Sequence, residues 1–182
     1  SLYNSDSRKG GVVMKAKVQV VGGDIARQDT DAIMTAINSA GAWFGGIDGV
    51  IQRAAGNHFH KQAASASPLE DGQTVVAKGK PGCSIKNVVF VVDDLQRPLS
   101  EIVQAGLIAA DEAGYRSVAV PTIRMGVMLG QVEKTDDEAY DQMHQGVQNF
   151  LSSGPECLEE IRFVVYDDTE MEAALRVKLG LG

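Results

Sequence analysis

Three glycine-rich segments have the composition of ligand-binding loops. They are GGDI at 22–25, the segment 40–49 and the segment 122–130. Glycine lets the main chain approach a phosphate closely and turn its amide N–H groups toward it. The second segment also runs into a helical pattern that begins near Ile47, and a helix N-terminus offers unpaired amides and the positive end of the helix dipole. The sequence therefore predicts an anion site built mainly from backbone.

Charge, cysteine and histidine content argue against other kinds of site. A formal net charge of −7 over 182 residues, with no dense run of Lys and Arg, argues against binding to duplex nucleic acid. Cys83 and Cys157 lie far apart without CxxC spacing, which favours reduced thiols. The histidines lack metal-site spacing and GxGxxG is absent, so neither a metal nor a cofactor is expected. No apolar run approaches the roughly 20 residues that cross a bilayer, and we expect a cytoplasmic protein that does not bind membranes.

The spacing of apolar residues predicts a sheet that would bring the three segments together. Six beta-branched, apolar segments have the length of buried strands: VQVVGGD, DAIMTAIN, TVVAKG, NVVFVVDD, SVAVPTI and IRFVVYDD. Helical patterns run from about 47 to 56, 98 to 114, 135 to 154 and 169 to 179. Each crossover helix must bury its apolar stripe against a sheet face, so the sequence predicts a three-layer α/β/α sandwich with a central mixed, mainly parallel sheet. Ligands bind in such folds outside the carboxyl ends of the strands.

The length and composition of the chain fit one compact domain. With 44% hydrophobic side chains over 182 residues, the chain can bury a single core, and no feature requires a second one. The first residues, SLYNSDSRKGGVV, are mostly small and polar. We therefore expect a tag remnant or flexible leader over 1–13 and one domain over 14–182.

Four of these segments together resemble the macro domain family, the ADP-ribose-binding module. They are GGDI after the first strand, TAIN at the end of the next, GGIDGVIQRAAG at the start of a helix and the later PTIRMGVMLG. GGIDGVIQRAAG is the most specific, because it is similar to the GGVDGAIHRAAG segment of MacroD-like members. The resemblance runs from about Val18 to the chain end, and it implies the macro domain fold and, as partner, ADP-ribose or an ADP-ribosylated protein.

The resemblance also implies a role for each segment. Asp24 would accept from the adenine amino group, with the Ile25 backbone alongside and Tyr166 or a neighbour over the ring. Asn38, whose amide can both donate and accept, would hold a hydroxyl of the distal ribose. The sequence leaves open whether Arg124 faces the ligand or a surface acid. The diphosphate would lie between two loops, represented by Gly45, Gly46 and Ile47 and by Thr122, Arg124, Met125, Gly126, Val127 and Met128.

Asp48 is the residue that could add catalysis to this binding site. The resemblance to hydrolytic members implies an acid here, near the distal ribose, that orients or deprotonates water with Asn38 holding the ribose. With an ordinary pKa of about 3.9, Asp48 is a weak base unless its surroundings raise that pKa. Purely structural roles stay open: Asp48 as a complement to the helix dipole, Asp24 as a turn former and Asn38 as a strand-end cap.

The sequence departs from the family pattern at three places, two of them near the distal ribose. Thr35 stands where the first asparagine of NAAN is usual, residues 41–44 (GAWF) replace LLGG, and Met128-Leu129 replaces the aromatic of TGVFG with one extra residue. Trp43 and Phe44 could wall the ligand or belong to the core. We therefore expect binding of ADP-ribose more firmly than its hydrolysis. The alternatives are a non-catalytic ADP-ribose reader, or a macro-fold protein whose site takes another ligand or a partner protein.

Overall fold

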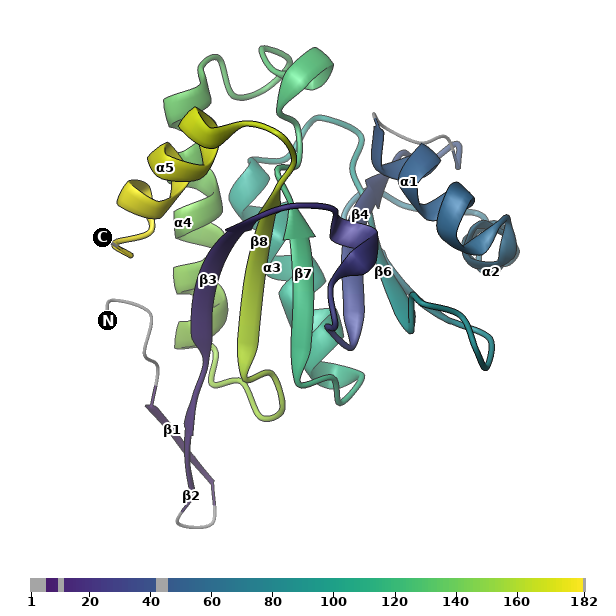
Figure 1. Ribbon diagram of the computed structural model, residues 1–182, viewed down its shortest axis with the longest axis horizontal. Helices are drawn as coiled ribbons and strands as arrows, with labels where there is room; N and C mark the ends of the chain where they lie inside the picture. The colour runs from purple at the N-terminus through teal and green to yellow at the C-terminus, as the bar shows by residue number, and fades with distance from the viewer. Residues whose placement is uncertain (1–5, 10–11, 42–45, 182) are drawn as a thin grey trace.

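The computed structural model describes residues 6–9, 12–41 and 46–181, which are built around one six-stranded sheet. Its strands lie in the order β3-β8-β7-β4-β6-β5, as Figure 1 shows. Neighbouring strands are parallel, except that β5 runs antiparallel to β6 at one edge. The six predicted strands are all present: β3 (Lys17–Gly22), β4 (Ala32–Ile37), β5 (Thr74–Lys78), β6 (Asn87–Val92), β7 (Ser117–Pro121) and β8 (Glu160–Val165).

Side chains of the central strands alternate between two cores, because successive residues of a strand point to opposite faces. Met34 and Val89 join one core, which is covered by three helices. Ile33 and Phe90 join the other, which is covered by two. The predicted three-layer α/β/α sandwich is therefore confirmed. The helices are α3 (Leu99–Glu112), α4 (Asp136–Ser152) and α5 (Thr169–Lys178) on the first face, and α1 (Gly46–Ala55) and α2 (His58–Ser65) on the second.

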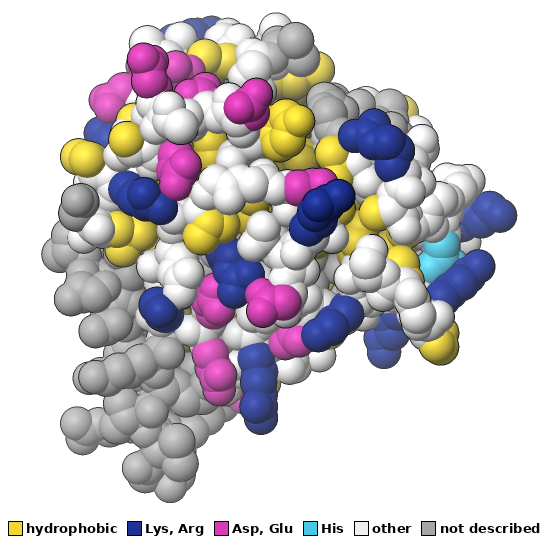
Figure 2. Space-filling model, viewed as in Figure 1, with side chains coloured by type: hydrophobic (Ala, Val, Ile, Leu, Met, Phe, Trp, Pro, Cys, Tyr) yellow, Lys and Arg dark blue, Asp and Glu magenta, His cyan; other side chains and the backbone are white. Residues whose placement is uncertain are grey.

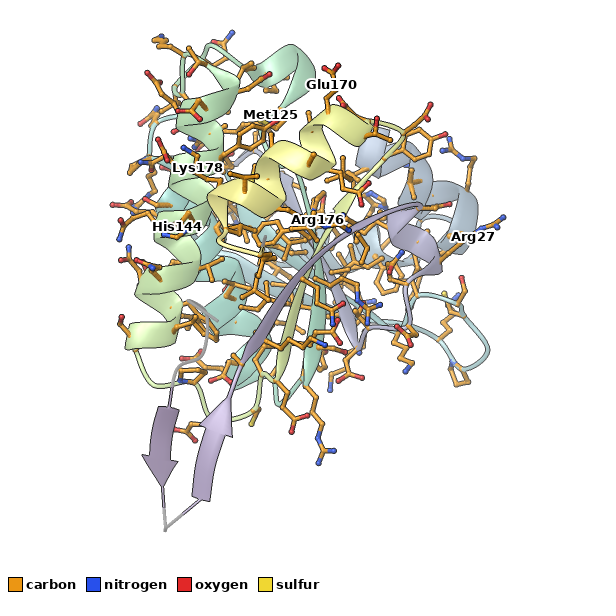
Figure 3. All side chains as sticks on the ribbon, turned by 60° about the vertical axis from the view of Figure 1, so that its left-hand side comes forward. Arg27, Met125, His144, Glu170, Arg176 and Lys178 are labelled. Carbon is orange, nitrogen blue, oxygen red and sulfur yellow. The ribbon has the colours of Figure 1, made fainter. Side chains whose placement is uncertain are left out.

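Polar contacts fix the helices on the first face. Arg176 of α5 donates to the carbonyl oxygen of Val20 in β3, with an Nη2–O distance of 2.8 Å, and pairs with Glu172. Figure 3 shows Arg176 between α5 and β3. At the start of α4, the predicted cap is present, because the backbone N–H of Glu138 donates to Thr135 Oγ1 at 3.1 Å. These contacts stabilise α5 against the sheet and the first turn of α4.

The register of the parallel strands brings their carboxyl ends to one edge of the sheet. Gly22 of β3 pairs with Val165 of β8, and Ile37 of β4 pairs with Val92 of β6. Residues that directly follow these strands are therefore close in space although they are far apart in the sequence. They are Gly23, Asn38, Asp93, Thr122 and Tyr166.

Two larger features of the structure were not predicted, besides two short helices described below. One is α2, whose segment HFHKQAAS is short and mixes polar residues with buried Phe59, His60 and Ala63. The other is an antiparallel hairpin of β1 (Asp6–Lys9) and β2 (Val12–Lys15), which projects from the main sheet in Figure 1. The hairpin includes residues that we expected in a leader over 1–13, so the domain extent 14–182 stays a prediction. Within the described ranges, no helix is long and apolar enough to cross a membrane.

Close packing of α3 on α4 leads to a stability prediction. A Cβ at Gly146 would lie 2.7 Å from the carbonyl oxygen of Ser100 and 2.9 Å from the Cβ of Val103, so Gly146→Ala forces the two helices apart. We expect a loss of about 1–3 kcal/mol in the free energy of unfolding, measured by urea denaturation. Gln145→Ala on the exposed side of the same helix is the control and should change stability little. Equal stability of the two variants would contradict the packing described.

Candidate functional site

A cavity of about 420 Å³ opens at the carboxyl edge of the sheet. This volume lies within the roughly 300–1,000 Å³ typical of small-ligand sites. The cavity is lined by the loops that follow β3, β6, β7 and β8, by the end of β4 and by α1. It therefore brings together parts of all three glycine-rich segments. The expected site residues that line it are Asp24, Ile25, Ile47, Thr122, Arg124, Met125, Met128 and Tyr166.

The first loop presents the carboxylate of Asp24 at one end of the cavity. One carboxylate oxygen, Oδ1, accepts from the backbone N–H of Ala26 at 2.9 Å and so caps the short helix η1 (Ile25–Arg27). The other oxygen, Oδ2, lies 3.8 Å from Nε of Arg27. Ile25 is only 4% exposed and anchors the loop in the core of the second face. The carboxylate is thus held in place by one oxygen while the other can accept a further hydrogen bond.

The N-terminal half of α1 forms a wall of the cavity. Gly46 begins this helix, Ile47 and Val50 line the cavity, and Asp48 is the third helical residue. The first amides of a helix have no intrahelical acceptor, so this end can bind an anion. Gly45, expected in the same loop, lies outside the described residues, as do Trp43 and Phe44.

The third loop turns sharply over the opposite side of the cavity. It contains η2 (Gly126–Met128), and Thr122, Met125 and Met128 line the cavity. Gly126 has a φ of 79°, in the left-handed region that glycine adopts without strain. Arg124 also has a positive φ, 64°, which is uncommon for a residue with a side chain and needs support from its surroundings.

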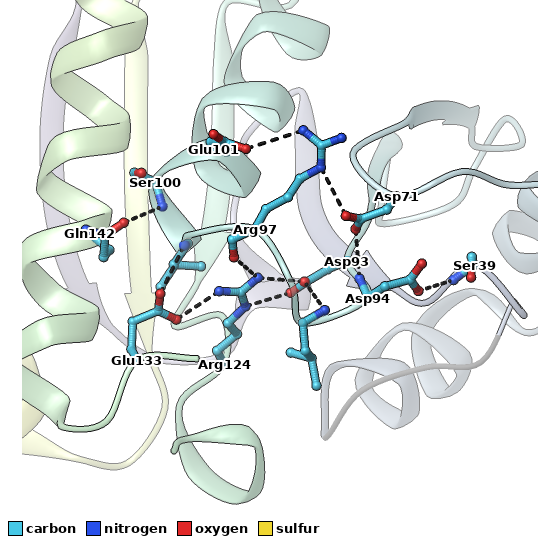
Figure 4. Close-up of polar contacts among 12 residues, drawn as sticks. Ser39, Asp71, Asp93, Asp94, Arg97, Ser100, Glu101, Arg124, Glu133 and Gln142 are labelled. Atoms are coloured by element: carbon cyan, nitrogen blue, oxygen red, sulfur yellow. Dashed lines mark hydrogen bonds and ion pairs between the residues drawn. The ribbon is translucent and has the colours of Figure 1, made fainter. Parts of the chain in front are cut away.

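That support is a buried cluster of charges, drawn in Figure 4. The guanidinium of Arg124 donates from Nε and Nη2 to the two carboxylate oxygens of Asp93 at 3.0 and 2.7 Å, and from Nη1 to Glu133 at 2.9 Å. All three side chains are at most 5% exposed. Burial on its own lowers the pKa of Arg124, but the hydrogen bonds to Asp93 and Glu133 outweigh it and the pKa is raised. The side chain is therefore charged and faces buried acids, not a surface acid.

The acids of this region connect the third loop to three other segments. Glu133 accepts from the backbone N–H of Leu99 at the start of α3 at 3.1 Å. Asp93 directly follows β6, and its neighbour Asp94 accepts from the backbone N–H of Ser39 at 2.8 Å, just beyond β4. Figure 4 shows these contacts as one continuous set. The loop after β7, the end of β4, the end of β6 and the start of α3 are thus fixed relative to one another.

Other expected site residues lie at the rim or beside the cavity. Tyr166 is 78% exposed at the rim, where its ring can cover a ligand. Asn38 directly follows β4, and its carbonyl oxygen accepts from the N–H of Gly41 at 2.9 Å. Asn38 and Gly126 are not among the described residues that line the cavity, and the side chains of Asp48 and Val127 lie outside what the structure describes.

Sequence reasoning missed two charged residues that line the cavity. Asp93 could have been found, because NVVFVVDD places an acid directly after a buried strand, at the sheet edge where ligands bind. Arg53 lies one turn after Gly49 in α1, and its Nη1 lies 3.2 Å from where a Cβ of Gly49 would be. Its guanidinium therefore folds back along the helix toward the cavity, which the helical periodicity alone did not indicate.

Comparisons with known proteins agree with this architecture. The family model described as Macro domain matches residues 34–139. An uncharacterized protein of Aquifex aeolicus is 31% identical over 172 residues, which cover 90% of this chain and 98% of that protein. An O-acetyl-ADP-ribose deacetylase of Salmonella gallinarum is 32% identical over 168 residues, covering 85% and 90% of the two chains. The crystal structure of the Trypanosoma brucei macrodomain in complex with ADP-ribose matches with a TM-score of 0.74 at 21% sequence identity. The match covers 91% of this chain and 69% of that one, and it supports the fold.

The buried cluster leads to a prediction about stability. Arg124→Met leaves the carboxylates of Asp93 and Glu133 buried without their partner, and breaking a buried pair in this way typically costs about 3–5 kcal/mol. We expect a loss of that size in urea denaturation. Arg124→Lys should lose less, because it keeps the charge but not the two-pronged geometry.

Arg97→Met is the matched control for this prediction. Arg97 belongs to the same set of contacts, but its side chain is 47% exposed and pairs with Asp71 and Glu101 near the surface. Exposed pairs contribute little to stability. If Arg97→Met and Arg124→Met destabilised the protein equally, burial would not be what makes the Arg124 cluster important.

Proposed function

The chain belongs to the macro domain family, and on that basis we propose that its cavity binds ADP-ribose, with residues 14–182 as the folded unit. The proposal rests on one observation: a single cavity has a carboxylate on one part of its lining and main-chain groups with a helix N-terminus on another. Asp24 offers a carboxylate acceptor at one end. The start of α1 and the third loop, which contains Gly126 and is called the Gly126 loop below, offer main-chain groups at the other. A nucleotide that has a base at one end and a diphosphate further along is complementary to this arrangement.

The adenine end is assigned to the first loop. Oδ2 of Asp24, which makes only the long contact with Arg27, accepts from the adenine amino group, and a hydrogen bond to a charged partner contributes roughly 1.5–3 kcal/mol. The backbone of Ile25 lies alongside, and Tyr166 covers the ring from the rim. The exposure of Tyr166 in the structure supports this role, because an uncovered aromatic ring gains apolar contact when a base stacks on it.

The diphosphate is assigned to the space between α1 and the Gly126 loop. Main-chain amides and the helix dipole supply the positive potential there, and the guanidinium of Arg53 adds to it from α1. Arg124 does not contact phosphate in this proposal, because its donors are taken up by Asp93, Glu133 and the carbonyl oxygen of Arg97. It acts as a positioning residue that fixes the start of the loop.

At the distal ribose we propose hydrolysis. Asn38 holds a ribose hydroxyl, and Asp48 in the first turn of α1 orients a water and accepts its proton. The water oxygen attacks the acyl carbon of an ester on the ribose, and the ribose oxygen leaves with a proton. Support comes from relatives named O-acetyl-ADP-ribose deacetylase at 28% and 32% identity. Removal of ADP-ribose from a modified protein acid is a second substrate class that the same groups would serve.

A non-catalytic reader is the second candidate function. It is favoured by Thr35, which lines the cavity where the usual family pattern has asparagine, and by residues 41–44 and Met128-Leu129, which also depart from it. A reader would bind ADP-ribose or an ADP-ribosylated protein through the same adenine and diphosphate contacts without turnover.

Binding is tested with Asp24→Asn. The asparagine oxygen can still cap η1, but the charge is gone, so the dissociation constant for ADP-ribose in calorimetry should rise by about 10-fold or more. Asp29→Asn is the control, because Asp29 is exposed, pairs with Arg162 and does not line the cavity. Unchanged affinity in Asp24→Asn would remove the adenine assignment, and absence of binding by the unmodified protein would remove the proposed ligand.

Catalysis is tested with Asp48→Ala. General base catalysis contributes about 10²–10⁴-fold, so product formation from O-acetyl-ADP-ribose should fall by about 100-fold or more. Calorimetry with ADP-ribose on the same variant separates loss of chemistry from loss of binding. Equal product formation by the two proteins would rule out Asp48 as the base. If the unmodified protein binds ADP-ribose but releases nothing from the ester or from an ADP-ribosylated protein, the reader function is correct.

A further inference from the structure

The two edge strands of the main sheet, β3 and β5, differ in how they are covered. At β3, Arg176 of α5 donates to the outward carbonyl oxygen of Val20 at 2.8 Å. Glu172 of the same helix lies beside this edge, with Oε2 2.8 Å from where a Cβ of Gly22 would be. Such cover matters, because the free N–H and C=O groups of an edge strand can pair with another strand. The opposite edge, β5, has less of it.

The outward main-chain groups of β5 can be identified from its pairing with β6. At the end of β5, Gly79 donates from its backbone N–H to the carbonyl oxygen of Lys86, which extends the ladder between the two strands. The directions of these groups alternate along an antiparallel strand. The N–H and C=O groups of Thr74, Val76 and Lys78 therefore point away from the sheet.

The side chain of Gln62 in α2 covers one of these three positions. Its Oε1 accepts from the backbone N–H of Lys78 at 2.9 Å, and its Nε2 donates to the carbonyl oxygen of Lys78 at 2.8 Å. These are the two bonds that a neighbouring strand would make. The outward groups of Thr74 and Val76 have no hydrogen-bond partner among the described residues. The open part of the edge is therefore short, and Gln62 fixes where a pairing strand must end.

The two ends of β5 carry opposite charges. Lys78 and Lys80 are exposed at its C-terminal end. Figure 2 shows Lys and Arg side chains at the side of the molecule where Figure 1 places the loop between β5 and β6. Glu70 is exposed in the turn before β5, and Asp71 beside it pairs with Arg97. A strand with an acidic start and a basic end is complementary to a second copy of itself that runs in the opposite direction.

We propose that β5 is the contact of a symmetric dimer, in which the β5 strands of two copies pair antiparallel across a two-fold axis at Val75. Thr74 of one copy then lies opposite Val76 of the other, and each such pair exchanges two main-chain hydrogen bonds. The acidic end of each strand lies beside the basic end of the other. Pairing also covers more of Val75 and Val76, which are only partly buried. A contact with this symmetry closes on itself, so assembly stops at two copies.

The dimer is compatible with an open ligand cavity in each copy. A two-fold axis between antiparallel strands of one sheet is perpendicular to that sheet, so the carboxyl edges of the two copies face opposite directions. None of the described residues that line the cavity belongs to β5. Dimer formation is therefore independent of the proposed ligand.

Sedimentation equilibrium of the unmodified protein over about 10–500 µM tests the contact, because an interface of one strand pair is small and weak. The average mass should rise with concentration from that of one chain toward that of two. The dissociation constant should increase with salt, since part of the contact is between exposed charges. The mass of a single chain throughout this range overturns the inference.

Exchange of the charges shows whether β5 is the contact. Glu70→Lys and Lys80→Glu each bring like charges together at both ends of the paired strands, so each should raise the dissociation constant of the dimer by about 5- to 30-fold. The double variant restores opposite charges and should recover most of the affinity. Glu159→Lys is the matched control, because Glu159 is exposed just before β8, on the other side of the sheet. Equal dissociation constants for Glu70→Lys and Glu159→Lys, or no recovery in the double variant, would place the contact elsewhere.

Thr74→Pro tests the main-chain part of the contact. Proline removes the outward N–H of Thr74 and leaves the bonds to β6 in place, and it is tolerated at the first residue of an edge strand. The dissociation constant should rise by about 10-fold or more, while circular dichroism stays that of the unmodified protein. An unchanged dimer in the folded variant rules out strand pairing. If Thr74→Pro does not fold, the charge exchange decides.

Discussion

The bond between Arg124 and Asp93 is the constraint on which the geometry of the site depends. Arg124 has a left-handed backbone conformation two residues before Gly126, and Asp93 directly follows β6, the neighbour of the edge strand β5. Buried ion pairs add little net stability compared with apolar packing, but they are costly to break and accept few geometries. The cluster therefore sets where the loop begins more than how stable the fold is. Its link through Glu133 to Leu99 extends the same constraint to α3.

The distribution of charge is compatible with the proposed binding of a diphosphate by an acidic chain. The cluster of Asp93, Arg124 and Glu133 has a formal charge of −1, which would oppose an anion nearby. The carboxylate of Glu133, however, faces the N-terminus of α3 and accepts from the amide of Leu99, and the positive end of that helix dipole compensates its charge. In the proposed complex, the diphosphate is bound by backbone amides and by Arg53. The net charge thus argues against duplex nucleic acid as a partner but is compatible with a small anion held by local groups.

The sheet and most helices could be predicted because their signals are local. Runs of beta-branched and apolar residues identified the strands, and apolar residues spaced three and four apart identified the longer helices. The short helix α2 escaped because its segment mixes polar and apolar residues, and buried His60 reads as polar in sequence. The partners of Arg124 could not be predicted, since they lie 31 and 9 residues away and meet it only after the strands have aligned. Asp93 could have been predicted as a site residue, because it directly follows a strand and ligands bind at that edge of the sheet. The direction of the Arg53 side chain could not have been predicted from the sequence.

The distal end of the cavity is where reader and hydrolase differ physically. Thr35 is buried and lines the cavity, and its hydroxyl supplies one donor where an asparagine amide would supply two. In the proposed complex the distal ribose is then held mainly by Asn38, while Asp24 and Arg53 hold the adenosine half and the phosphates. Binding energy placed far from the reacting bond accelerates a reaction only when it is used to align that bond. In the proposed hydrolysis, turnover therefore depends on how well the start of α1 aligns Asp48 with a ribose that is held mainly by Asn38.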